Sequence, residues 1–138
     1  MLNSVFNKSF KAKNYDRSEF LCSYSSGECP QTDKKLWSKD KLISYGKLPN
    51  NKYMINWPIN GNDYYSNSIE MTAKERLLSY EEAKQKSLRF LYFIQTEMNY
   101  TNLSIDYDEY QTKDGFPVIP YHRESRRSEG MVTLTLND

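Results

Sequence analysis

The longest periodic pattern of apolar and polar positions lies in residues 73–98, which contain neither glycine nor proline. Apolar side chains recur there at helical spacing, at positions 77, 80, 88, 91, 94 and 98, and lysines and glutamates lie between them. Thr72 and Glu75 form a capping-box pattern at the start. The pattern predicts a helix ~39 Å long, whereas a compact chain of this length has a radius of gyration of ~14 Å. One end of the helix should therefore overhang or meet a partner outside the chain.

The second half of this helix is apolar nearly all round at residues 88–94. Such a surface implies burial on more than one side. Two interpretations have equal weight. Either parts outside the chain cover this half, or it is the core helix of a small α+β domain.

Three other stretches have strand character. Residues 52–57 are rich in aromatic and branched side chains and end at Pro58, residues 116–119 are a short apolar run, and residues 131–136 alternate cleanly. Residues 36–48 fit a strand or a short helix. We predict an α+β fold in which a small mixed or antiparallel sheet packs against one long helix.

The N-terminal region has poor periodicity. Residues 1–35 mix asparagine, serine and lysine with isolated aromatics, and residues 26–30 have turn chemistry. We expect a poorly organised segment at 1–35, loosely ordered by itself, and a single α+β domain at 36–138. At 138 residues the chain has enough length for one core. Its hydrophobic content of 38% and mean hydropathy of −0.85 make it more polar than an average domain, and twelve tyrosines supply much of its apolar surface.

Charge and composition restrict the classes of function. The formal net charge is +1, which argues against nucleic acid as a partner, because affinity there comes from neutralising many phosphates. No apolar run reaches the ~20 residues that cross a bilayer, and none at the start resembles a signal peptide. Cys22 and Cys29, with one distant histidine, cannot complete a structural zinc site. We therefore expect reduced thiols, no metal, no membrane contact and a cytoplasmic location.

An acidic stretch at residues 99–115 contains Asp106, Asp108, Glu109 and Asp114. It lacks the residue order of a calcium-binding loop and the distal bidentate glutamate. We interpret it as an acidic surface loop.

The strongest candidate for a site is the segment at residues 119–127. It holds the only histidine, His122, and three of the six arginines, Arg123, Arg126 and Arg127. Guanidinium groups pair bidentately with carboxylate or phosphate, and an imidazole exchanges protons near neutral pH. The cluster therefore suits an anionic group. A solvated charged surface is the alternative, and composition alone favours it.

A second candidate lies after the predicted strand at 52–57. Residues 60–63 have strong turn chemistry, and amide side chains in such a loop can bind a ligand. The candidates for substrate binding are Asn56, Trp57 and Asn60. The alternative for the asparagines is a turn with surface amides, and for Trp57 we favour a core anchor over a stacking platform.

Together these segments resemble a large family of bacterial FAD-dependent oxidoreductases. The resemblance rests on Lys-Tyr-x-x-Asn at 52–56, Phe-Leu-Tyr-Phe at 90–93 and Arg-Glu-Ser-Arg-Arg at 123–127, and it covers residues 47–136. It implies a fold like the cap or substrate part of a flavoprotein. It also implies that Arg123, Arg126 and Arg127 hold an anionic substrate group or support charge on the flavin. His122 or Tyr121 would then serve proton transfer, with Arg123 as the first choice for contact with the ligand.

The chain departs from this family in one respect. Family members carry a glycine-rich dinucleotide-binding turn near the N-terminus, and here no two of the five glycines form G-x-G. We therefore expect an interior piece of a flavoenzyme that does not hold FAD alone. Its partners would be the remainder of the flavoprotein, including its dinucleotide-binding domain, and a small-molecule substrate. The alternative is a non-catalytic module that binds carbohydrate or protein through Tyr64, Tyr65, Trp57 and residues 60–62. A hydrolase using His122 and Glu124 is weaker, because no nucleophile elbow or metal pair accompanies them.

Overall fold

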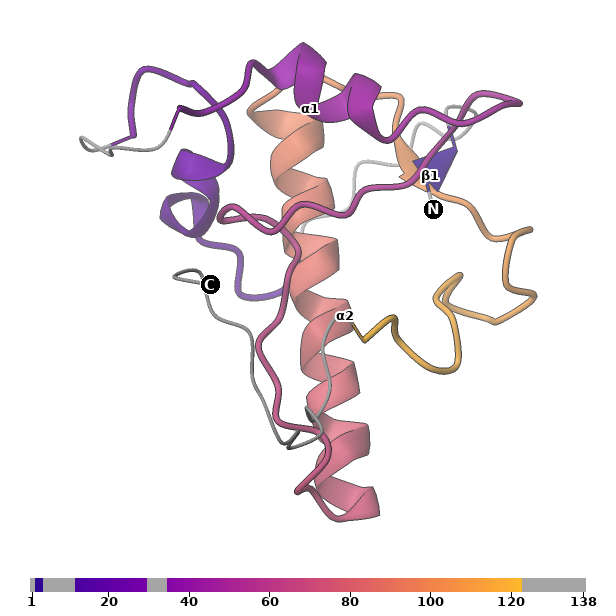
Figure 1. Cartoon of the computed structure of the whole chain (residues 1–138). Coiled ribbons are helices and arrows are strands. Elements are labelled where there is room, and N and C mark those ends of the chain that lie inside the picture. Colours follow the sequence, from indigo (N-terminus) through magenta and orange to yellow (C-terminus); the bar gives the residue numbers. More distant parts are fainter. Residues whose placement is uncertain (1, 4–11, 30–34, 123–138) are drawn as a thin grey trace, which may run out of the picture.

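The computed structural model describes residues 2–3, 12–29 and 35–122. Within these residues, the elements follow one another in the order β1, η1, α1, β2, α2 and β3 (Figure 1). Their bounds are Leu2–Asn3 for β1, Arg17–Ser23 for the 3-10 helix η1, Lys39–Tyr45 for α1, Lys52–Tyr53 for β2, Ala73–Thr96 for α2 and Ser104–Ile105 for β3.

The predicted long helix is confirmed as α2, which has 24 residues and is therefore ~36 Å long. Its capping box is present: the Thr72 hydroxyl accepts from the Glu75 N–H at 3.3 Å, and the Glu75 carboxylate accepts from the Thr72 N–H at 2.8 Å. The N-terminal turns extend past the other described elements, and the segment leading into the helix runs beside them (Figure 1). A hydrogen bond of 2.7 Å between the hydroxyls of Ser66 and Ser79 joins this segment to α2.

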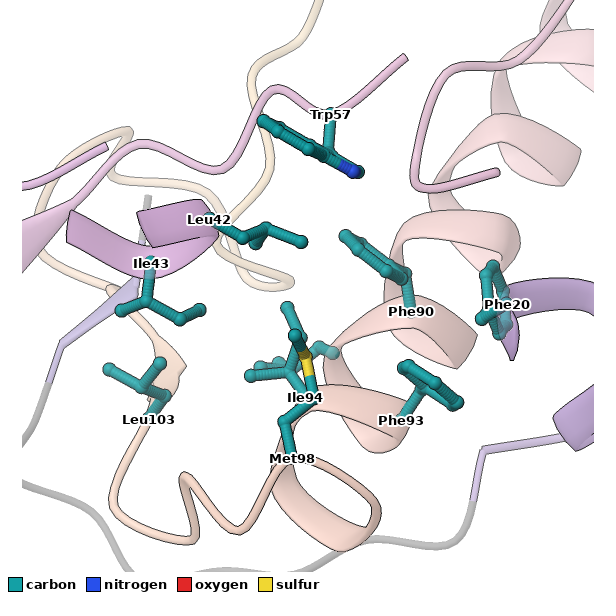
Figure 2. Packing of buried hydrophobic residues seen from close by; sticks show 10 residues of the cluster. Phe20, Leu42, Ile43, Trp57, Phe90, Phe93, Ile94, Met98 and Leu103 are labelled. Atoms are coloured by element: carbon teal, nitrogen blue, oxygen red, sulfur yellow. The ribbon is translucent and has the colours of Figure 1, made fainter. Parts of the chain in front are cut away.

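The core lies around the C-terminal half of α2. Phe90 and Phe93 project from the helix towards Phe20 of η1, and α1 covers another side of the helix (Figure 2). The cluster of buried side chains consists of Phe20, Leu42, Ile43, Trp57, Phe90, Leu91, Phe93, Ile94, Met98 and Leu103. The chain itself therefore covers the apolar half of the helix. This agrees with the second of the two interpretations, in which this half is the core helix of a small α+β domain.

The two segments before the long helix contribute to this core. Within residues 36–48, Lys39–Tyr45 form the short helix α1, whose N-cap is the Ser38 side chain, so the open choice between strand and helix is decided for helix in that part. Phe20 is fully buried. Its ring packs against Phe90 and Phe93 and so anchors residues 12–29 on α2. The expectation of a poorly organised segment at residues 1–35 stays a prediction. The domain boundary at residue 35 stays a prediction.

The described helices and short strands are compatible with an α+β fold, but a sheet packed against the long helix is not shown. The described strands have two residues each and form a small antiparallel sheet, in which β1 pairs with β2 on one side and with β3 on the other. Only Lys52–Tyr53 of the predicted strand at 52–57 is a strand. The reason is local, because the Asn62 side chain accepts from the Trp57 N–H at 2.8 Å and donates to the Ile55 carbonyl at 2.9 Å. These backbone groups are thus satisfied without a neighbouring strand.

The strand predicted at residues 116–119 is absent for a similar reason. The Phe116 N–H donates to the Asp114 carboxylate at 3.1 Å, and the Phe116 carbonyl accepts from the Thr112 hydroxyl at 2.7 Å. These two side chains therefore bond to the Phe116 backbone groups that a neighbouring strand would otherwise pair with. The strand predicted at 131–136 lies outside the described residues.

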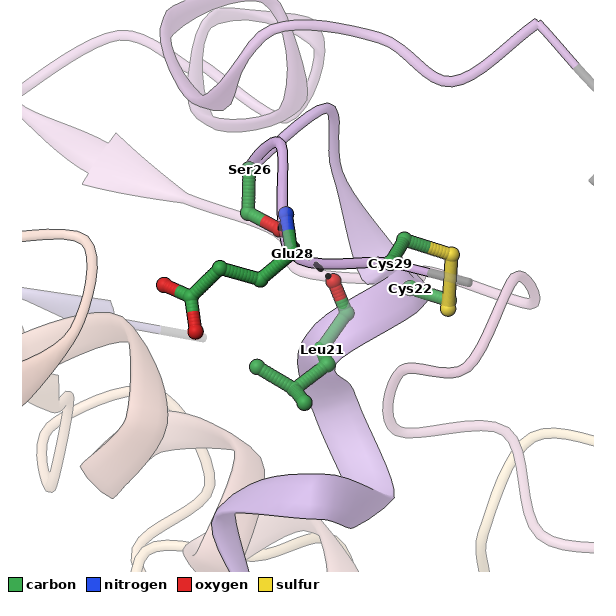
Figure 3. The surroundings of a disulfide bond; sticks show 5 residues. All are labelled: Leu21, Cys22, Ser26, Glu28 and Cys29. Carbon is green, nitrogen blue, oxygen red and sulfur yellow. Dashed lines mark hydrogen bonds between the residues drawn. A yellow bond between two sulfur atoms is a disulfide. The ribbon is translucent and has the colours of Figure 1, made fainter. Parts of the chain in front are cut away.

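Cys22 and Cys29 form a disulfide, so the prediction of reduced thiols is wrong. A turn with Gly27 at φ +80° brings their Cα atoms within 4.9 Å of each other. The Ser26 hydroxyl bonds to the backbone on both sides of this turn (Figure 3). Disulfides persist mainly in oxidising compartments, so the bond counts against the expected cytoplasmic location, which stays a prediction. None of the described helices combines the length and apolar character needed to cross a bilayer.

Candidate functional site

The predicted arginine cluster lies outside the described residues at Arg123, Arg126 and Arg127. Its two preceding neighbours, Tyr121 and His122, are described, and both are exposed. Tyr121 has 80% of its surface accessible. The candidate catalytic side chains of Tyr121 and His122 are therefore accessible to solvent and to a ligand.

His122 is held against the N-terminal half of α2. Its Nε2 atom lies 3.3 Å from the Tyr80 hydroxyl, in hydrogen-bond contact. The two rings also touch, with centroids 5.8 Å apart and an angle of 56° between their planes. Sequence reasoning missed Tyr80, because its helical spacing pointed to the core and no local pattern links it to a residue 42 positions away.

The predicted substrate-binding residues have separate environments. Trp57 is buried, and its indole N–H donates to the Ser23 carbonyl at 2.7 Å, so it is a core anchor. Asn56 and Asn60 are exposed, and Asn60 has φ +46°, which confirms the predicted turn. The arrangement leaves the two amides available to a ligand and removes the indole ring as a platform for one.

The carbohydrate-binding or protein-binding alternative needed Trp57, Tyr64, Tyr65 and residues 60–62 on one exposed face. The burial of Trp57 removes its largest aromatic ring. The Asn62 amide is already bonded to the Trp57 N–H and to the Ile55 carbonyl. The exposed aromatic residues of that surface are therefore Tyr64 and Tyr65, and Tyr65 is 94% exposed. The geometry that this alternative required is therefore not present.

Two adjoining hollows lie between α2 and the segment at residues 105–116. Leu88, Ile105 and Phe116 line both of them, and their volumes are about 90 and 260 Å³. At the rim, Lys84 pairs with Asp114 at 2.6 Å and lowers the pKa of that carboxyl. Both hollows are smaller than the ~300 to 1,000 Å³ of ordinary ligand sites. We interpret them as packing defects beside the core.

The acidic loop is not wholly a surface loop, contrary to the prediction. The side chain of Asp106 is 1% exposed and pairs with the Lys52 ammonium at 2.8 Å, and Lys52 also contacts Glu109 at 2.9 Å. The hydrogen bond from Lys52 is the main cause that lowers the pKa of Asp106, against the opposing effect of burial. The same two carboxylates raise the pKa of Lys52. This triad joins the start of β2 to the end of β3 and has a structural role.

The described residues do not fit the pyrophosphate of FAD. A phosphate-binding helix offers free N–H groups at its start, but at α2 the Glu75 carboxylate already occupies that position with its negative charge. Glycines in such a cradle let a ligand approach the backbone. Here three glycines are instead packed against the chain itself, Gly46 against Met54, Gly61 against Trp57 and Gly115 against Ile105. If FAD is bound, another region must hold its pyrophosphate.

Exposed apolar side chains lie near the Tyr80–His122 contact. On α2, Leu77 is 68% exposed and Leu78 is also exposed, three and two residues before Tyr80. In the chain leading to His122, Val118 is 81% exposed and Ile119 is exposed as well. The predicted overhang of the helix is therefore accompanied by uncovered apolar surface at the same end.

Comparison with known proteins gives one match. A family model described as FAD dependent oxidoreductase matches residues 3–138, which is nearly the whole chain. No curated protein and no solved structure matches the chain.

Proposed function

Because the chain belongs to the FAD-dependent oxidoreductase family, we propose that it contributes substrate-side and flavin-adjacent residues of such an enzyme. The flavin supplies the redox chemistry when it is bound, and the protein supplies binding, orientation and electrostatics. In this proposal Arg123, Arg126 and Arg127 bind an anionic group, and His122 or Tyr121 exchanges a proton with the substrate.

The observation that carries the proposal beyond the family match is the position of His122. It is exposed, it contacts α2 through Tyr80, and the apolar side chains of Leu77 and Val118 are uncovered nearby. Large exposed apolar patches mark interaction sites in soluble proteins. We infer that a further part of the flavoprotein, including a dinucleotide-binding region, covers this end of α2 and completes the site around His122.

The first experiment measures flavin in the purified chain. The isolated chain is expected to retain no FAD, because the arginines do not replace a helix N-terminus with free amides. Absorbance spectra before and after dialysis against FAD give the occupancy. FAD bound to the isolated chain at near-unit occupancy would contradict the proposal that another region holds the pyrophosphate.

The second experiment uses the complete, FAD-loaded enzyme that contains this sequence. Arg123→Lys keeps the charge and loses the planar fork, so turnover should fall tenfold or more, equivalent to about 1.4 kcal/mol per decade. Arg17→Lys is the matched control. Arg17 pairs with Glu28 and with Glu97, the C-cap residue of α2, so the turnover of this variant should equal that of the parent. Equal activity of both variants and the parent would remove Arg123 from the site.

A further inference from the structure

Among the described residues, Tyr80 is the one whose side chain hydrogen-bonds to His122. It belongs to the regular, capped part of α2, whereas His122 belongs to an irregular segment. The hydroxyl and the ring of Tyr80 both contact the imidazole, at 3.3 Å between Oη and Nε2 and 5.8 Å between ring centroids. The contact thus links His122 to a regular helix.

Either group can donate across this contact, and we assign the phenol as the donor because its O–H is the more acidic group and the imidazole lone pair is the better acceptor. A phenol carries one acidic O–H, and a neutral imidazole has one nitrogen with a free lone pair. When the phenol donates to Nε2, the imidazole proton must reside on Nδ1, since the hydrogen bond at one nitrogen sets the state of the other. The contact through Nε2 therefore selects the tautomer with an Nδ1–H group, which is directed away from Tyr80.

We propose that Tyr80 is a positioning residue that holds His122 in the Nδ1–H tautomer and directs this N–H towards an anionic oxygen of the substrate. The catalytic meaning of this inference depends on the proposed function, whereas the tautomer does not. The Nδ1–H is a hydrogen-bond donor, so the ligand that it suits is a small molecule with a carboxylate, a phosphate or an alkoxide oxygen.

The test uses the fact that His122 is the only histidine. Two-bond proton–nitrogen correlation spectra of the ¹⁵N-labelled chain at alkaline pH, where an imidazole is neutral, report the tautomer without an assignment problem. The parent is expected to show the Nδ1–H pattern. Tyr80→Phe keeps the ring and loses the hydroxyl, so the spectrum should change to the Nε2–H pattern. Tyr65→Phe is the control, because Tyr65 is 94% exposed, whereas the described hydrogen bond and ring contact of His122 are both with Tyr80.

A second variant separates the hydrogen bond from the ring contact. The imidazole protons of the parent should be shifted by the ring current of Tyr80, and the shift should persist in Tyr80→Phe and disappear in Tyr80→Leu. An Nε2–H pattern in the parent, or an unchanged pattern in Tyr80→Phe, would overturn the inference. A circular dichroism spectrum of each variant shows that the helix is retained.

Activity of the complete enzyme distinguishes this inference from the proposed function. Tyr80→Phe should lower kcat several-fold with little change in KM, whereas Tyr65→Phe should leave both unchanged. The expected tautomer in an enzyme without FAD-dependent turnover would refute the proposed function and leave the Tyr80–His122 pair intact. Full activity of Tyr80→Phe would instead reject the positioning role alone.

Discussion

Truncation of Leu91 tests the interpretation of α2 as the core helix. Leu91 is 4% exposed, and it also lines the hollow of about 90 Å³ beside the core. Leu91→Ala would enlarge an existing space that the surrounding side chains already fail to fill. A loss of ~3 kcal/mol in the free energy of unfolding is therefore expected, within the range of ~2 to 5 kcal/mol for buried leucines.

The matched control is Leu77→Ala on the same helix. Leu77 is 68% exposed, so the variant should change the free energy of unfolding by less than ~0.5 kcal/mol. Both variants replace leucine by alanine within a helix, so their difference in helix propensity cancels. The comparison therefore isolates burial.

Urea denaturation followed by circular dichroism measures both variants, with the disulfide intact. For a chain of 138 residues the entropy of unfolding is ~0.3 kcal/mol/K, so a loss of ~3 kcal/mol lowers the melting temperature by ~10 °C. Equal losses in the two variants would refute the reasoning. Leu91 would then be no better covered than Leu77, and the apolar half of α2 would await a partner.

Two further predictions concern the charged triad and the disulfide. Lys52 lowers the pKa of the buried Asp106 carboxyl, so that pair should stabilise the fold above the ordinary aspartate pKa of ~3.9 and lose its effect as the pH falls through the lower, folded-state value. Urea midpoints should fall more steeply below about pH 4 in the parent than in Asp106→Asn, and identical profiles would contradict this assignment. The disulfide closes a small loop between Cys22 and Cys29, and chain entropy predicts ~2 to 3 kcal/mol of stabilisation. Urea unfolding with and without a dithiol reductant checks this value, and coincident curves would show that the bond does not constrain the chain in solution.

The sequence by itself determined α2 and its cap. The Thr72–Glu75 capping box and the helical spacing of the apolar residues act within a few positions of each other, so they can be read without the rest of the fold. The turn at Asn60 was predictable for the same reason, because a short polar side chain tolerates positive φ locally.

Only the tertiary structure decided where the remaining apolar and polar groups go. The Asn62 side chain takes the backbone bonds that a strand partner would have made, Lys52 reaches a carboxylate 54 positions away, and His122 meets Tyr80. Each contact depends on groups brought together by chain folding, and no local period encodes such partners. Likewise, Leu91 and Leu77 occupy equivalent places in the helical pattern, but one is buried and the other exposed. The periodic pattern determines which face of the helix is apolar. The packing of η1, α1 and the chain around Trp57 then determines which part of that face, along the helix, is buried.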